Sequence, residues 1–166
     1  MMFNDMASLG KAVLLALILA WMAPAWGHAA GSAEVPTAQD FLMEAKAAEA
    51  GRLPILVIFS RPNCPYCKRV LNEFLEPMQR NPEYRGKVMM RQVIVGSHAR
   101  LRDFTGGTTT HNEFAKASSI GMVPVIKLYD SWGNTLTEPL TGFTSPDYYG
   151  EILDQRIDEA LAKIRK

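Results

Sequence analysis

Residues 54–60 are apolar without polar alternation and rich in β-branched side chains, a pattern typical of a strand buried on both faces of a sheet. Further strands are predicted at about residues 88–95 and at 125–129. A turn at residues 130–134 leads from the latter into a fourth predicted strand at 135–140. The last two strands therefore predict a hairpin.

Helical periodicity, with apolar positions three or four residues apart, occurs four times along the chain. The first predicted helix has Thr37 as its N-cap and Gly51 as its C-terminal cap. The second follows the first strand and should break or kink near Pro77, because proline cannot donate to the helical hydrogen-bond ladder.

The third and fourth predicted helices carry start signals of their own. Thr110 and Glu113 form a capping box for a short helix that ends near Gly121. Ser145 is a predicted N-cap, and Pro146 takes the first position of the last helix. The apolar stripe of that last helix indicates a side that packs against the core.

The order of these elements predicts an α/β fold with a central mixed sheet and helices on both faces. A strand–helix–strand start gives a parallel pair, and the final hairpin adds an antiparallel edge. Residues 96–109 are polar, with two glycines and a run of threonines, and predict a loop or insert. His98 in this segment and His111 just after it are expected at the surface.

The N-terminal segment has the layout of a secretory signal peptide. Lys11 precedes an apolar run over residues 12–26, and small residues follow it, so cleavage is expected near Ala29. An uncleaved anchor is the alternative, but the run is shorter than the roughly 20 residues that span a bilayer. The sequence thus predicts a signal peptide at 1–29, a disordered lead-in at 30–36 and one domain at 37–166.

Composition and charge narrow the range of partners. The chain has 166 residues, 18 Lys and Arg against 17 Asp and Glu, and a net charge of +1. A near-neutral charge spread along the chain argues against nucleic acid or an anionic membrane as a partner. The signal segment and the balanced charge together predict an exported protein without nucleic-acid partners.

The only two cysteines, Cys64 and Cys67, stand between the first strand and the second helix. The N–H groups at a helix N-terminus act as partial positive charges and favour the thiolate, which is the form that attacks disulfides. Closing so short a ring would stabilise the fold by only about 2 kcal/mol, so reactivity explains the pair better than stapling does. Arg61, Lys68 and Arg69 lie close in sequence and could add to the positive field, or could form a merely solvated face.

Metal binding is the alternative interpretation of two neighbouring cysteines. A structural zinc site would need two further ligands, and the chain has only His28, His98 and His111, none at ligand spacing. Haem attachment needs a histidine directly after the second cysteine, where Lys68 stands. We therefore expect no metal and no bound cofactor.

Over about residues 37–165 the chain resembles the thioredoxin-like superfamily. The matching features are the apolar strand, the Cys64-Pro65-Tyr66-Cys67 motif, the Val123-Pro124 pair before a strand, a glycine after the hairpin and a closing helix. With its signal segment and the stretch Gly142-Phe143-Thr144-Ser145-Pro146 it most resembles exported bacterial proteins of the SoxW type, which implies a periplasmic location. The CPYC motif, in contrast, is that of glutaredoxins.

The resemblance implies a role for each matching residue. Cys64 would be the exposed nucleophile and Cys67 the resolving thiol of a redox-active disulfide, with a cis peptide bond before Pro124. The backbone of Val123 would pair with the substrate chain, and Pro65 and Tyr66 are further candidate substrate contacts.

Two positions depart from the pattern of thioredoxins. Ile58 stands where they carry a buried acid, and Asn63 stands where they carry a tryptophan.

The sequence predicts an exported thiol–disulfide oxidoreductase that exchanges disulfides with partner proteins, and the resemblance to the SoxW type implies that it acts as a reductant. A membrane-bound electron donor is a candidate partner. Two alternatives remain open: a glutathione-dependent glutaredoxin, suggested by the CPYC motif, and a non-catalytic docking or chaperone module with the same fold.

Overall fold

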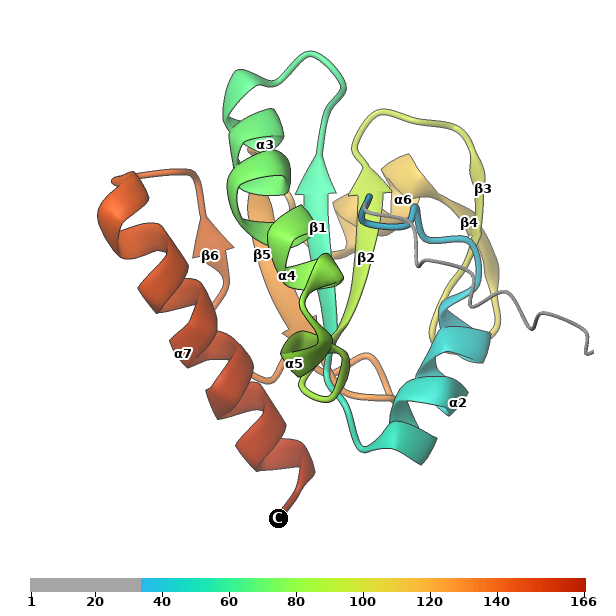
Figure 1. The fold of residues 1–166 in the computed structure, drawn as a ribbon. Coiled ribbons are helices and arrows are strands. Elements are labelled where there is room, and N and C mark those ends of the chain that lie inside the picture. The colour runs from blue at the N-terminus through green and yellow to red at the C-terminus, as the bar shows by residue number, and fades with distance from the viewer. Residues whose placement is uncertain (1–33) are drawn as a thin grey trace, which may run out of the picture. The chain divides into compact units, whose positions relative to one another are not determined.

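The strand predicted at residues 54–60 forms the centre of a four-stranded sheet (Figure 1). The structure is a computed structural model that describes residues 34–166, so the predicted signal peptide lies outside the described residues. In chain order its elements are α2 (Phe41–Gly51), β1 (Ile55–Ser60), α3 (Pro65–Val70), a π-helical turn η1 (Leu71–Leu75), α4 (Glu76–Arg80), α5 (Pro82–Arg85), β2 (Met89–Ile94), β3 (Arg100–Arg102), β4 (Thr108–Thr110), α6 (His111–Ala117), β5 (Val125–Tyr129), β6 (Leu140–Thr141) and α7 (Pro146–Ile164).

The sheet has the strand order β2-β1-β5-β6, with β1 parallel to β2 and antiparallel to β5. Helices cover both of its faces, α2 and α6 on one, α3, α4 and α7 on the other (Figure 1). This arrangement confirms the predicted α/β class with a mixed sheet. No helix between residues 34 and 166 has the length and hydropathy needed to cross a bilayer.

The continuous apolar character of β1 follows from its place between two cores. Ile55, Val57 and Phe59 pack toward α2 and α6, whereas Leu56 and Ile58 pack toward α3 and α7. All five side chains are fully buried. At about 25 cal/mol per Å² of buried apolar area, such two-sided burial is the largest stabilising contribution a strand can make.

The start of the first helix differs from the prediction. Asp40, not Thr37, is the N-cap of α2, and its carboxylate accepts the Met43 N–H at 2.9 Å. Thr37 instead forms a parallel bridge with Gln92 on the edge of β2. The helix ends at Arg52 in the left-handed conformation (φ 51°), so Gly51 is its last residue and not its cap.

Part of the expected lead-in is also attached to the domain. Val35 is buried in the core on the α7 side, and the carbonyl of Pro36 accepts the Gln92 N–H at 2.8 Å. The predicted disorder at 30–36 therefore does not describe residues 35 and 36.

Residues 96–109 are not the simple loop that their polarity suggested. Two short strands, β3 and β4, pair antiparallel, and Asp103 closes their turn by accepting the backbone N–H groups of Thr105 and Gly107. Phe104 stacks on Phe41 of α2 with ring centroids 4.7 Å apart. Three-residue strands carry too little alternation for the sequence to reveal them.

The final hairpin is also shorter than predicted. Only Leu140 and Thr141 form β6, and Thr135 makes an isolated bridge with Tyr129. Pro139 lies between these pairings and has no N–H with which to continue the ladder.

Pro77 does not end the second helix. The helical path continues from α3 through η1 into α4, and Pro77 lies in the first turn of α4. The wider π-helical turn before the proline, with the Glu76 N–H bonded to the Leu71 carbonyl, takes the place of the predicted break.

The predicted starts of the last two helices are found where the sequence placed them. Thr110 caps α6 by accepting the Glu113 N–H at 3.2 Å. Pro146 opens α7, although the Ser145 side chain makes no capping bond.

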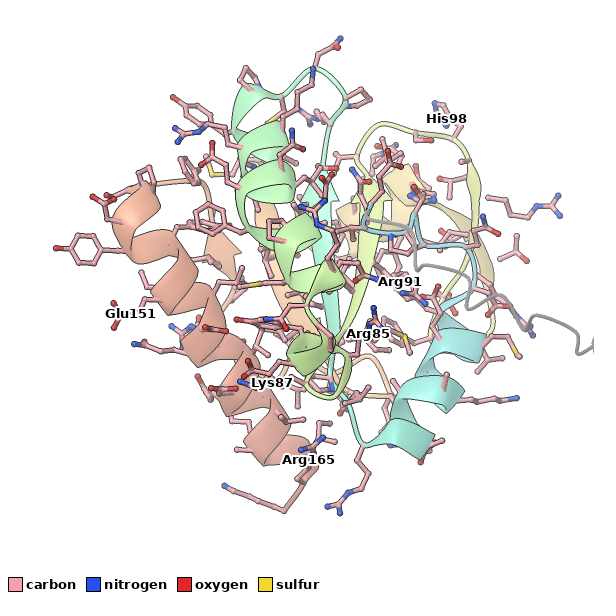
Figure 2. All side chains as sticks on the ribbon, viewed as in Figure 1. Arg85, Lys87, Arg91, His98, Glu151 and Arg165 are labelled. Carbon is pink, nitrogen blue, oxygen red and sulfur yellow. A yellow bond between two sulfur atoms is a disulfide. The ribbon has the colours of Figure 1, made fainter. Side chains whose placement is uncertain are left out.

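His111 is buried and not at the surface, which corrects the sequence-based expectation. Its Nδ1 accepts the Ile94 N–H at 3.0 Å, so the ring ties α6 to the end of β2. Burial lowers the pKa of His111, against a smaller opposing effect of its hydrogen bond to the Ala38 backbone. His98, in contrast, lies exposed on the loop between β2 and β3 (Figure 2).

We predict that His111 makes the stability of the fold fall in mild acid. The unfolded chain takes up a proton near pH 6.5, whereas the folded chain resists protonation at this ring, so stability is present above about pH 6.5 and is lost below it. The free energy of unfolding, measured in urea between pH 5 and 7.5, should fall by up to about 1.4 kcal/mol per pH unit. His111→Gln should remove most of that slope and His98→Gln should not; equal slopes in all three proteins would contradict the assignment.

Candidate active site

Cys64 and Cys67 form a disulfide at the N-terminus of α3, with their Cα atoms 5.2 Å apart. Cys64 is the N-cap residue, in extended conformation, and Pro65 occupies the first turn of the helix. Proline costs nothing there, because the first N–H groups of a helix have no intrahelical partner. The loop from β1 is short and is closed by the Cys64 N–H bonded to the Arg61 carbonyl at 3.2 Å.

The two sulfur atoms differ in environment. Cys64 is partly exposed, whereas Cys67 is 1% exposed. The Cys67 N–H points at the Cys64 Sγ at a distance of 3.1 Å. After reduction the same N–H, with the positive end of the helix, would stabilise a thiolate at Cys64. An attacking partner therefore reaches Cys64 and not Cys67.

The Val123-Pro124 segment lies at the same end of the sheet as the dithiol. Phe59 pairs with Val125, so the chain that leaves β1 toward Cys64 starts beside the chain that enters β5. The Val123–Pro124 peptide bond is cis, as the resemblance implied, and Pro124 is buried. Among the described residues, the backbone N–H and C=O of Val123 make no hydrogen bond. They are available to pair with a bound chain.

A third segment joins the site through Gly142, whose N–H donates to the Pro124 carbonyl at 2.8 Å. The next residue, Phe143, brings its ring to 6.2 Å from the Tyr66 ring, between centroids. Tyr66 is 57% exposed. Sequence reasoning included Phe143 only in the stretch that carries the resemblance and gave it no role at the site, because no local pattern separates it from an ordinary loop aromatic.

Arg69 lies over this aromatic pair. Its guanidinium carbon is 4.5 Å from the Phe143 ring centroid, a cation–π geometry. The same guanidinium bonds both carboxylate oxygens of Glu73, at 2.8 and 3.1 Å. The pair is exposed, so it positions Arg69 more than it stabilises the fold.

Ile58 fills the position at which thioredoxins carry a buried acid. Its side chain is fully buried in the core beside α3, together with Val70 and Leu75. This position therefore supplies no group that could take or give a proton at Cys67. Among residues 34–166, no group of three or more His, Cys, Asp or Glu side chains is arranged to hold a metal ion.

Comparison with known sequences decides the family. The sequence model of the thioredoxin-like domain matches residues 41–157, which is most of the chain. The chain belongs to the thioredoxin-like domain family. Among curated protein sequences, none is significantly similar to it.

Solved structures of thioredoxin-fold proteins are similar to this one. The oxidoreductase DsbH superposes with a TM-score of 0.54 at 13% identity, over 77% of this chain and 85% of that chain. The oxidised C-terminal domain of DsbD from Neisseria meningitidis gives a TM-score of 0.44 at 22% identity, over 72% of this chain and 98% of that one. Spinach chloroplast thioredoxin f gives 0.48 at 18% identity, over 81% and 99%. At these identities the similarity to DsbH shows the fold alone.

The family and the dithiol together make this chain a thiol–disulfide oxidoreductase. The Cys64–Cys67 disulfide has one accessible sulfur and one protected sulfur, and it lies at the start of a helix in a thioredoxin-like domain. In a thiol–disulfide exchange the accessible thiolate would attack a partner disulfide to form a mixed disulfide, and the protected thiol would then attack Cys64 and release the partner. Two electrons pass from the dithiol to the partner, or the reverse when the steps run backwards.

We predict that the two cysteines have separable roles. Cys64→Ser should abolish reduction of insulin by the full chain with dithiothreitol as donor, because the accessible cysteine sulfur is lost. Cys67→Ser should still attack but cannot resolve, so it should accumulate a covalent complex with its substrate, visible by mass spectrometry and removed by excess dithiothreitol. Turnover by the Cys64→Ser protein would show that the roles are assigned wrongly.

Proposed function

We propose that the protein is exported and uses its dithiol to reduce disulfides of partner proteins in the periplasm. The observation that carries the proposal is that the Cys64–Cys67 pair and the unpaired backbone of Val123 lie at the same end of the sheet. A substrate strand that pairs with Val123 would lie along the edge where Cys64 is accessible. Such pairing gives affinity through backbone hydrogen bonds, so it suits protein chains better than small thiols.

The exchange would begin with the thiolate of Cys64. It attacks one sulfur of the partner disulfide, and the other partner sulfur leaves as a thiolate that takes a proton from water. Cys67 then loses its proton and attacks the Cys64 sulfur, so that the partner leaves as a dithiol and Cys64–Cys67 becomes the disulfide. A separate donor, for which a membrane-bound protein is our candidate, would return the two electrons.

The direction of transfer rests on the resemblance to exported proteins of the SoxW type. Equilibrating the full chain in dithiothreitol redox buffers and trapping free thiols with an alkylating reagent gives the potential of the Cys64–Cys67 couple. We predict a value near the roughly −270 mV of thioredoxin. A value near the roughly −120 mV of the oxidant DsbA would reverse the proposed direction.

Export rests on the sequence of residues 1–29, with their basic residue, apolar run and small residues. We predict that the protein recovered from the periplasm of an expressing bacterium has lost about 29 residues, as N-terminal sequencing would show. Replacing Leu15 and Leu17 by Glu should interrupt the apolar run and leave the protein uncleaved in the cytoplasm. Full-length protein that stays in the membrane would instead indicate an anchor.

The CPYC motif favours one alternative, a glutathione-dependent glutaredoxin. Glutathione carries little backbone for pairing with Val123, so a protein disulfide should be reduced faster than a glutathione mixed disulfide. The opposite preference, in a glutathione-coupled assay, would favour the glutaredoxin. A docking module would keep its function in a protein that lacks both cysteines.

A further inference from the structure

Three segments at the end of the sheet that holds the dithiol are unusual in charge, and we call them the rim: residues 61–69, 119–125 and 141–146. Residues 61–69 carry Arg61, Lys68 and Arg69 and no acid, while residues 119–125 and 141–146 carry no charged side chain. The chain as a whole is almost balanced, with 18 bases and 17 acids. A rim with three bases and no acid is therefore a local feature and not a consequence of composition.

The bases on this rim differ in how their charge is balanced. The side chains of Arg61 and Lys68 are exposed and make no hydrogen bond or ion pair with other described residues. Arg69 is neutralised in part, because Glu73 binds it through two hydrogen bonds. The first acids that follow the three segments along the chain are Glu73, Asp130 and Asp147. The rim thus keeps two unbalanced positive charges and one partly balanced charge.

The partly balanced charge has a fixed place. Arg69 lies over Phe143, Phe143 follows Gly142, and Gly142 is bonded to Pro124. The guanidinium therefore lies where the dithiol helix meets the segment that holds the cis-proline. A chain bound at Val123 and Cys64 would lie at the same end of the sheet as this guanidinium.

We propose that the rim recognises partner segments that are acidic beside their reactive cysteine. This proposal deepens the proposed function, on which it rests, by naming the chemistry of the substrate. Opposite charges at an exposed protein surface raise the rate of association and choose among partners more than they tighten the complex. One exposed charge pair should change the second-order rate constant about two- to fivefold at low ionic strength.

The experiment uses three disulfide peptides that differ only in the residues flanking the cysteine: two Asp, two Gln or two Lys. The reduced full chain should react fastest with the Asp peptide and slowest with the Lys peptide. The ratio of the Asp to the Lys rate constant should fall toward one in about 0.5 M salt, because salt screens exposed charges. Using this ratio cancels any effect on the reactivity of Cys64 itself, since that effect is common to all three peptides.

Two groups of variants should change the ratio of the Asp to the Lys rate constant in opposite directions. Arg61→Gln and Lys68→Gln should each lower it, whereas Glu73→Gln should raise it, because that change releases the charge of Arg69. Adding Arg69→Gln to Glu73→Gln should cancel the gain. Arg85→Gln is the matched control, because Arg85 is exposed and unpaired among the described residues. It is the last residue of α5, at the other end of the sheet (Figure 2).

The outcomes separate the two proposals. The acidic-partner proposal would be overturned if the ratio of the Asp to the Lys rate constant were near one in the unchanged protein, or if Glu73→Gln lowered it. Reduction of the Gln peptide would in that case still support the proposed function. If Lys68→Gln and Arg85→Gln changed the ratio equally, the acidic-partner proposal would also be overturned, because equal changes would reflect the net charge of the protein alone. If none of the peptides is reduced, the proposed function fails and this inference fails with it.

Discussion

The antiparallel pairing of β1 with β5 is the constraint on which the site depends. Each strand is short, yet both are buried on the two faces of the sheet, so their register is fixed by the core. The pair Phe59–Val125 sets the starting points of two loops at the same edge. One loop leads to Cys64 and the other contains Pro124. A slip of one residue would turn every side chain of β1 into the opposite core and would separate the dithiol from the cis-proline.

The helix that follows the dithiol adds the chemical asymmetry. Because Cys64 is the N-cap residue, its sulfur receives the Cys67 N–H and stays partly exposed, whereas Cys67 is one turn inside and buried. In an extended strand the same residue spacing would put the two side chains on opposite faces, about 10 Å apart, which is too far for a disulfide. The order of attack and resolution is thus set by the position of the pair relative to the helix end.

The sequence predicted those parts of the molecule that have a local signal. The buried strand, the start of α6 at Thr110 and the dithiol are each encoded within a few neighbouring residues. Elements that depend on distant partners could not be predicted in this way: Thr37 forms a bridge with Gln92, far along the chain, and is not a helix cap. His111 follows a polar segment and appears exposed by composition, yet it is buried against β2 because β3 and β4 fold back as a hairpin.

The electrostatics of the site have a part fixed by the backbone and a part contributed by exposed side chains. With Ile58 in place of a buried acid, no charge from the core acts on Cys67, and the field at the sulfurs comes from the helix N-terminus and the exposed bases. The contact of 3.1 Å from the Cys67 N–H is fixed by the helix, and salt screens such a short contact little. The bases project into water, where screening is strong. We therefore infer a separation of roles, in which the backbone makes the thiolate and the side chains of the rim choose the partner.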